Sequence, residues 1–177
     1  MLWRANRKHL SIEAIRDSVL FVSGQLDLTP RGRPGQLWGK DYTRRRAIYG
    51  YINRFNLDPT LRAFDFPAPM QSQPARKESI VAPQALFSMN SPFVIDQAKA
   101  LTQTETFESL TTDADQITEL FNIILQRQPE PLETERFLRF VELQSRYKKT
   151  KTTDDKAATW PLAAQALMMS NEFLYVD

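Results

Sequence analysis

The 177-residue sequence contains no cysteine, and this absence excludes several kinds of chemistry at once. Without thiols the chain forms no disulfide, no thiolate-bound zinc site, no cysteine nucleophile and no covalent attachment of c-type haem. Histidine is almost as scarce, since His9 is the only one. A Ser-His-Asp triad would have to use His9. Its position in a basic run beside Arg7 and Lys8 favours a solvated residue ahead of a helix.

Long apolar runs and glycine are also scarce. No apolar stretch of about 18 residues is present, so the sequence predicts neither a membrane span nor a signal peptide within these residues. The chain has five glycines and eleven prolines. Turns are therefore made more by proline than by glycine, which favours helices that begin at X-Pro steps over β-hairpins.

Positive charge is concentrated at the start of the chain. Residues 1–46 contain ten Lys or Arg and four Asp or Glu, whereas the remaining residues contain 13 and 17. A basic segment of this kind can bind nucleic acid. The arginines are nevertheless interleaved with apolar residues, and no nucleic-acid-binding motif accompanies them. We therefore expect ion pairing within the protein, or docking against further protein, and we do not expect nucleic acid as a partner.

Apolar spacings of three and four residues predict an all-α fold, an irregular helical bundle that forms one domain over residues 1–177. Ser11 is a candidate N-cap for a helix that ends at Gly24, with Arg16 and Asp17 on its flank. Asp58-Pro59 predicts a short helix inside a long extended connector around residues 55–80. Further helices are predicted to begin at Pro83, at Ser91-Pro92, at Thr112 or Asp113, at Leu132 and, last in the chain, at Trp160.

Three segments carry more specific expectations. Arg44–Arg54 fits the helical and the strand period alike, and we favour a short helix. The loop between Gly24 and Gly39 lacks the spacing of a phosphate-binding loop, and we expect Leu37 and Trp38 to pin it to the core. Residues 148–156 form a polar segment that is predicted to lie at the surface.

Four motifs follow one another along the chain: IRDSVLFVSG at 15–24, RRRAIYGYINR at 44–54, VAPQALFSMNSPFV at 81–94 and SNEFLYVD at 170–177. In this order they resemble the C-terminal domain of unknown function of large planctomycete proteins, many of which carry cytochrome c-like segments. The resemblance runs from about Trp3 to Asp177. It implies the C-terminal part of a larger, exported or periplasmic multidomain protein, here an N-terminally truncated copy. It also implies that any haem lies elsewhere in larger relatives, with no cofactor in this chain.

The resemblance brings no established catalytic residue, but it marks polar positions in and between the motifs. Ten of them are structural or binding candidates: Arg16, Asp17, Arg45, Tyr49, Asp65, Arg76, Gln84, Asn90, Asn171 and Glu172. No metal site is predicted. We expect the three carboxylates of this set to pair with arginines or to cap helices.

Two classes of function compete. The favoured one is a non-catalytic helical module that gives structure to a larger protein or binds its other domains, and a truncated core near Trp3 would promote self-association. The alternative is part of an enzyme or polysaccharide-binding domain that uses Asp17, Asp65 and Glu172. Two carboxylates act as acid and base when a fold holds them about 5 to 9 Å apart.

Overall fold

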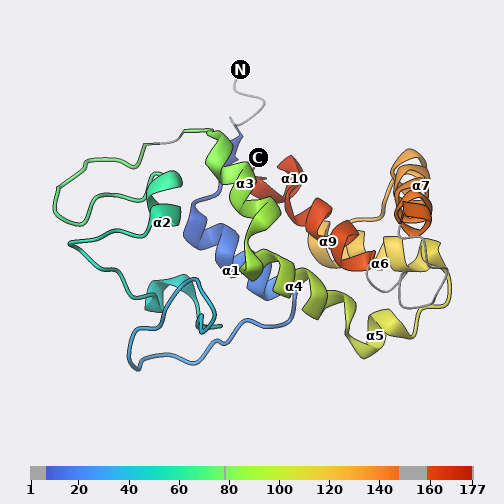
Figure 1. The fold of residues 1–177 in the computed structure, drawn as a ribbon, viewed down its shortest axis with the longest axis horizontal. Helices are drawn as coiled ribbons and strands as arrows, with labels where there is room; N and C mark the ends of the chain where they lie inside the picture. The colour runs from blue at the N-terminus through green and yellow to red at the C-terminus, as the bar shows by residue number, and fades with distance from the viewer. Residues whose placement is uncertain (1–6, 78, 148–158, 177) are drawn as a thin grey trace, which may run out of the picture.

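The computed structural model describes residues 7–77, 79–147 and 159–176, and the fold of this part of the chain is all-α, as predicted (Figure 1). Trp3 and the polar segment 148–156 lie outside the described residues. The elements are β1 (Lys8–His9), α1 (Ile12–Val22), the 3-10 turn η1 (Ala47–Tyr49), α2 (Pro59–Ala63), α3 (Ala82–Asn90), α4 (Pro92–Thr102), α5 (Glu105–Glu108), α6 (Asp113–Leu125), α7 (Pro131–Tyr147), α9 (Trp160–Met168), α10 (Asn171–Leu174) and β2 (Tyr175–Val176).

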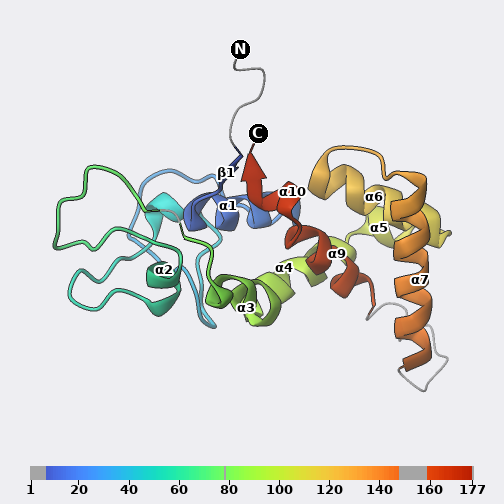
Figure 2. The same ribbon diagram turned by 90° about the horizontal axis from the view of Figure 1, so that it is seen from above.

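The helices occupy the middle and one end of the molecule, and the long loops occupy the other end. Figure 1 shows α1, α3, α4 and α9 in the middle, with α5, α6 and α7 on one side of them and α2 with its flanking loops on the other. Seen from above, α7 projects at the far end (Figure 2). The two halves of the fold therefore differ in kind: one is a helical bundle, and the other is mostly irregular chain around the short elements η1 and α2.

Helices α4 and α9 form the centre of the bundle by packing along each other. Three alanines at this contact, Ala98, Ala163 and Ala164, are almost completely buried and let the two helix backbones approach closely. Side chains of α1, α6 and α7 complete one continuous apolar core around them. Buried Gln165 adds a polar contact, because its amide donates to the carbonyls of Ser88 and Met89, which end α3 (2.8 and 2.9 Å).

Helix α1 begins and ends where its sequence predicts. The Ser11 hydroxyl accepts a hydrogen bond from the Ala14 amide, and Gly24 follows the helix with a φ of +69°, which a residue without Cβ adopts at no steric cost. The expected position of Arg16 on the helix flank is wrong. Arg16 is 1% exposed and lies in the apolar stripe between Ile12 and Val19.

Buried Arg16 organises the loop that follows α1. Its guanidinium donates to the carbonyl oxygens of Leu37 (3.3 Å), Arg45 (2.8 Å) and Thr43. The aromatic rings of Trp38 and Phe93 lie against it, at 5.8 and 5.4 Å from ring centre to guanidinium carbon. Three carbonyls of an irregular loop thus receive their hydrogen bonds from one side chain, while Leu37 and Trp38 are packed into the core, as predicted.

The favoured helix at Arg44–Arg54 is wrong, because this segment contains only the 3-10 turn η1. Its flanks are extended and form isolated bridges, Asp27 with Arg45 and Gly35 with Gly50. Gly50 leaves no room for a side chain, since a Cβ there would lie 2.4 Å from the Leu37 side chain. Tertiary contacts with buried Leu37 therefore override the helical period of this segment.

The carboxyl end continues past the helix that was predicted to be the last. After α9, the short helix α10 leads into β2, which pairs antiparallel with β1 so that His9 lies opposite Tyr175. The two rings meet edge to face at 4.9 Å between centroids. His9 is therefore half-buried in a strand pair and is not a solvated residue ahead of a helix.

Replacing Arg16 with methionine is expected to lower the free energy of unfolding by about 3 kcal/mol or more, because three loop carbonyls lose their buried donor. Urea unfolding measures the difference. The exposed Arg44 is the matched control, and Arg44→Met is expected to change stability by less than about 0.5 kcal/mol. Equal stability of the two variants would contradict a central role for Arg16.

Candidate functional site

The predicted candidate residues lie in three separate places. Arg16, Asp17, Arg45 and Tyr49 hold the loop that follows α1. Asp65, Arg76 and Gln84 hold the connector. Glu172 lies at the start of α10 beside Asn171, which is exposed, and Asn90 is exposed at the end of α3. The second group borders two hollows of about 440 and 460 Å³.

In the first group, Arg45 and Asp17 also order the loop after α1, as Arg16 does. Arg45 donates to the carbonyls of Thr29 (3.2 Å), Arg33 (3.1 Å) and Arg31, and its guanidinium lies 4.0 Å from the centre of the Tyr49 ring. Asp17 accepts a hydrogen bond from the Ala47 amide at 2.7 Å and so caps η1. Much of the positive charge of this loop is therefore bound to its own backbone carbonyls.

Asp65 closes the base of the loop that leads from Phe66 through Lys77 toward α3. Its carboxylate accepts hydrogen bonds from the Ser79 amide (2.7 Å) and hydroxyl (2.6 Å), which joins the two ends of the loop. Asp65 has a φ of +54°, a left-handed conformation that costs most residues energy and that aspartate tolerates better than others. Asp65 was expected to pair with an arginine or to cap a helix, but its partner is Ser79.

Two further contacts hold this base against the helices. The Gln84 amide donates to the carbonyls of Ala63 (3.1 Å) and Ser79 (2.9 Å) from inside the fold, where Gln84 is buried. Arg76 forms a two-pronged ion pair with Glu13 of α1, with both N–O distances at 2.8 Å. Burial alone would raise the pKa of Glu13, but the hydrogen bonds and charge of Arg76 outweigh it and lower the pKa.

The anchored connector borders two hollows. We call the first the strand-side cleft; its volume is about 440 Å³, and it lies between β1, β2 and the connector. It is lined by Arg7, Lys8, His9, Leu10, Ser11, Phe64, Asp65, Arg76, Lys77, Ser79, Ile80, Gln84 and Tyr175. We call the second the connector hollow; its volume is about 460 Å³. Asp65 and Lys77 line both.

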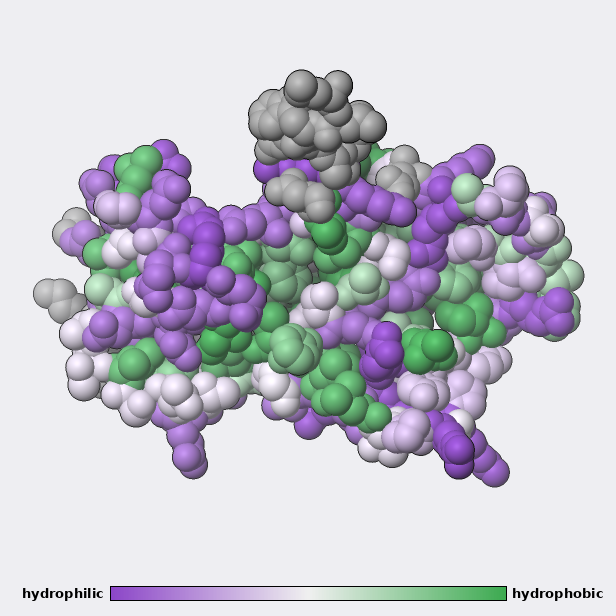
Figure 3. All heavy atoms as spheres, turned by 180° about the vertical axis from the view of Figure 1, so that it is seen from behind, coloured by the Kyte–Doolittle hydropathy of each residue, from purple (hydrophilic) through white to green (hydrophobic). Residues whose placement is uncertain are grey.

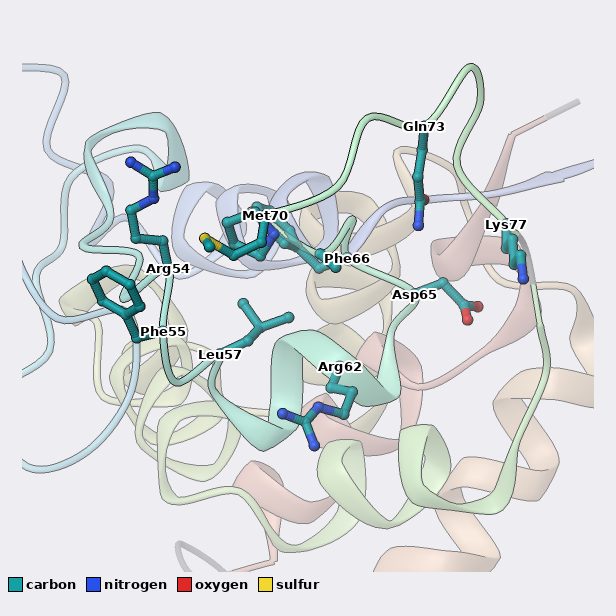
Figure 4. A pocket seen from close by; sticks show the side chains of 11 residues that line it. Arg54, Phe55, Leu57, Arg62, Asp65, Phe66, Met70, Gln73 and Lys77 are labelled. Carbon is teal, nitrogen blue, oxygen red and sulfur yellow. The ribbon is translucent and has the colours of Figure 1, made fainter.

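The connector hollow combines basic and apolar side chains (Figure 4). Figure 4 shows Arg54 and Phe55 on one side, Asp65 and Lys77 on the other, and Leu57 between them. It is lined by Arg54, Phe55, Leu57, Arg62, Asp65, Phe66, Ala68, Pro69, Met70, Gln73 and Lys77. Such a volume lies within the range of about 300 to 1,000 Å³ that is typical of small-molecule sites.

The three candidate carboxylates do not share a cleft. Asp65 lines both hollows, whereas Asp17 and Glu172 line neither. Asp17 faces the loop after α1, with Arg46 at 3.4 Å, and Glu172 faces Arg127 at the end of α6, with N–O distances of 2.6 and 2.8 Å. Each carboxylate thus has its own structural partner, and no two of them are placed to act as acid and base on one substrate.

Arg127 joins α6, α7 and α10 by holding two carboxylates at once. It donates to both oxygens of Glu133 at 2.7 Å and to both oxygens of Glu172. Its hydrogen bonds lower the pKa of Glu133 to about 2 and also lower the pKa of Glu172. The contact with Glu172 does not follow from the sequence pattern, because Arg127 lies 45 residues away in the chain and belongs to no predicted motif.

Two general findings apply to the described residues. Among them, no group of three or more acidic or histidine side chains is placed to hold a metal ion. None of their helices has both the length and the apolar character needed to cross a membrane.

The sequence model of a protein family, PSD1, matches residues 1–141, which is most of the chain; the family is described as "protein of unknown function (DUF1553)". The chain belongs to the PSD1 family. No curated protein and no solved structure matches it. Membership agrees with the predicted domain of unknown function, although the match ends within α7 and the resemblance was predicted to extend to Asp177.

Sequence reasoning missed several residues of this PSD1 chain that shape the site. Ser79, the partner of Asp65, belongs to no motif, and Phe55, Arg62 and Lys77 were not among the predicted candidates. No charge pattern in the sequence marks them, since residues 55–80 contain three basic and three acidic residues.

Asp65→Ala is expected to destabilise the base of the loop by about 1–2 kcal/mol, because it removes two hydrogen bonds and leaves a Cβ residue at positive φ. Asp65→Asn retains an acceptor and suits this conformation. Faster amide exchange across residues 66–80 in Asp65→Ala, but not in Asp65→Asn or in the exposed control Asp41→Ala, would verify the contact. Similar exchange in all variants would disprove it.

Acidification is expected to release α10. Because Glu133 and Glu172 have lowered pKa values in the folded protein, their contribution to stability is present above the ordinary range of glutamate and is lost as the pH falls through the folded values. The three side chains are partly exposed, so the loss is small, about 1 kcal/mol or less. NMR titration and urea unfolding of Glu172→Gln, with the exposed Glu135→Gln as control, measure it. A control variant with the same pH profile as Glu172→Gln would refute the assignment.

Proposed function

We propose that this PSD1 chain is a non-catalytic helical module of a larger exported multidomain protein, where it gives structure and binds other domains or ligands. One observation carries the proposal: the carboxylates that an enzyme would need are each held by a separate structural contact. Export, the planctomycete setting and cytochrome c-like segments elsewhere in the protein are part of this proposal through the resemblance of the four motifs.

The surface is consistent with a binding role. Figure 3 shows apolar residues across the middle of one face, with hydrophilic residues toward both ends. Fifteen large apolar side chains of the described residues are exposed, among them Phe55, Ile80 and Met89. Apolar surface that the chain does not cover itself is typical of a protein that is covered by a partner, which includes a second copy of the chain.

The enzyme alternative predicts turnover that depends on Asp65, the one of the three carboxylates that lines the connector hollow and the strand-side cleft. The non-catalytic function predicts no turnover of a panel of neutral and acidic polysaccharides by the full chain, with products followed by mass spectrometry. Asp17→Ala is expected to lower stability by about 1 kcal/mol, because the amide of Ala47 loses its acceptor. Turnover by the natural sequence that disappears in stably folded Asp65→Asn would overturn the non-catalytic function.

The interaction role is tested on the larger protein. Amide exchange in this region is expected to be slower there than in the isolated chain in at least one surface segment, because a neighbouring domain covers it. Light scattering of the isolated chain separates this effect from self-association. Identical exchange in both contexts, together with a monomeric isolated chain, would contradict an interaction module.

A further inference from the structure

The connector hollow carries positive charge that the fold does not use. Within the described part of the chain, Arg54, Arg62 and Lys77 form no ion pair, and all three are exposed. Two other arginines differ, because Arg76 pairs with Glu13 and Arg127 pairs with two glutamates. Three unpaired cations around one hollow attract an anionic ligand, and a guanidinium binds a carboxylate with two parallel hydrogen bonds.

The apolar side chains of the hollow indicate a ligand that also has a ring or another apolar face. Phe55 is 85% exposed, although a phenylalanine gains free energy when it leaves water. Figure 4 shows its ring beside Arg54 at the edge of the hollow. Met70 is 61% exposed on the anchored loop. A ring stacked on Phe55 would therefore place an acidic substituent within reach of Arg54.

Asp65 adds the opposite charge on the far side of the hollow. One of its carboxylate oxygens is bound to Ser79, and within the described residues the other oxygen accepts no hydrogen bond. A free carboxylate oxygen accepts hydrogen bonds from hydroxyl groups and repels any anionic group placed against it, so the acid groups of a ligand bind at the cations and a hydroxyl group binds at Asp65. The ligand thus needs hydroxyl groups as well as acid groups. A nucleic acid fits less well, because it requires a row of cations and several stacking rings.

We propose that the connector hollow binds an acidic saccharide, with a sugar ring on Phe55, carboxylates at Arg54, Arg62 and Lys77, and a hydroxyl group at Asp65. The proposal rests on the proposed function as a non-catalytic binding module and gives that module a ligand class. The anchored base of the loop, formed by Asp65, Ser79 and Gln84, holds the hollow open before the ligand arrives, which lowers the entropic cost of binding.

Calorimetric titration of the full chain with a trimer of galacturonic acid tests the proposal, with the neutral galactose trimer as the matched probe. We expect saturable binding of the acidic trimer alone, weakened by added salt because the contacts are exposed. Arg54→Gln and Arg62→Gln are each expected to weaken binding about tenfold. Lys99→Gln on α4, exposed and outside the hollow, is expected to bind like the natural sequence.

Weaker binding by these variants would not reflect a folding defect. Arg54 and Arg62 are exposed and form no ion pair within the described residues, so their variants are expected to unfold at the same temperature as the natural sequence. Equal binding of the neutral trimer, or of Arg54→Gln, would overturn recognition of the acid. Tighter binding of single-stranded oligothymidylate through the same residues would replace the saccharide with nucleic acid. Absence of binding at millimolar trimer would refute the ligand but not the module, whereas cleavage of bound trimer would refute the non-catalytic function alone.

Discussion

Half of this structure depends on one buried guanidinium. Arg16 lies in the apolar stripe of α1 and supplies hydrogen bonds to three carbonyls of a loop that has almost no regular structure of its own. Burial lowers the pKa of Arg16, and the charge of Asp17 opposes this, so the group stays charged in the core. Arg45 within the loop and Asp17 on α1 then hold its outer turns. Side-chain N–H groups thereby bind the carbonyls of an irregular segment. In a β-sheet, backbone N–H groups would bind them.

The sequence predicts the helices well and the loops poorly, for a physical reason. Caps at Ser11, Asp58 and Thr112 act within three residues, so their patterns are local and readable. Arg16 was predicted on the helix flank, although it stands four residues after Ile12, on the buried stripe. The segment 44–54 has the helical period, but its shape is decided by Leu37 and Asp17, which are distant in the sequence.

The candidate site shows the same division. Asp65, Arg76 and Gln84 were singled out by resemblance, and the structure brings these three to one place. Their partners Glu13 and Ser79 could not be inferred, because no spacing rule connects residues on either side of a loop. The unpaired cations of the connector hollow were equally hidden, since only the fold tells which arginines already have a partner.

The Asp65–Ser79 contact also allows the loop to change in evolution independently of the core. Because Asp65 and Ser79 hold the two ends of the loop together, residues can be inserted at its tip without moving α2 or α3, and each doubling of its length adds only about 0.6 kcal/mol of closure entropy. Three prolines in the tip limit the freedom that the unfolded segment has to lose. The loop can therefore diversify in length and composition among chains that share this helical framework, while its two ends stay in place.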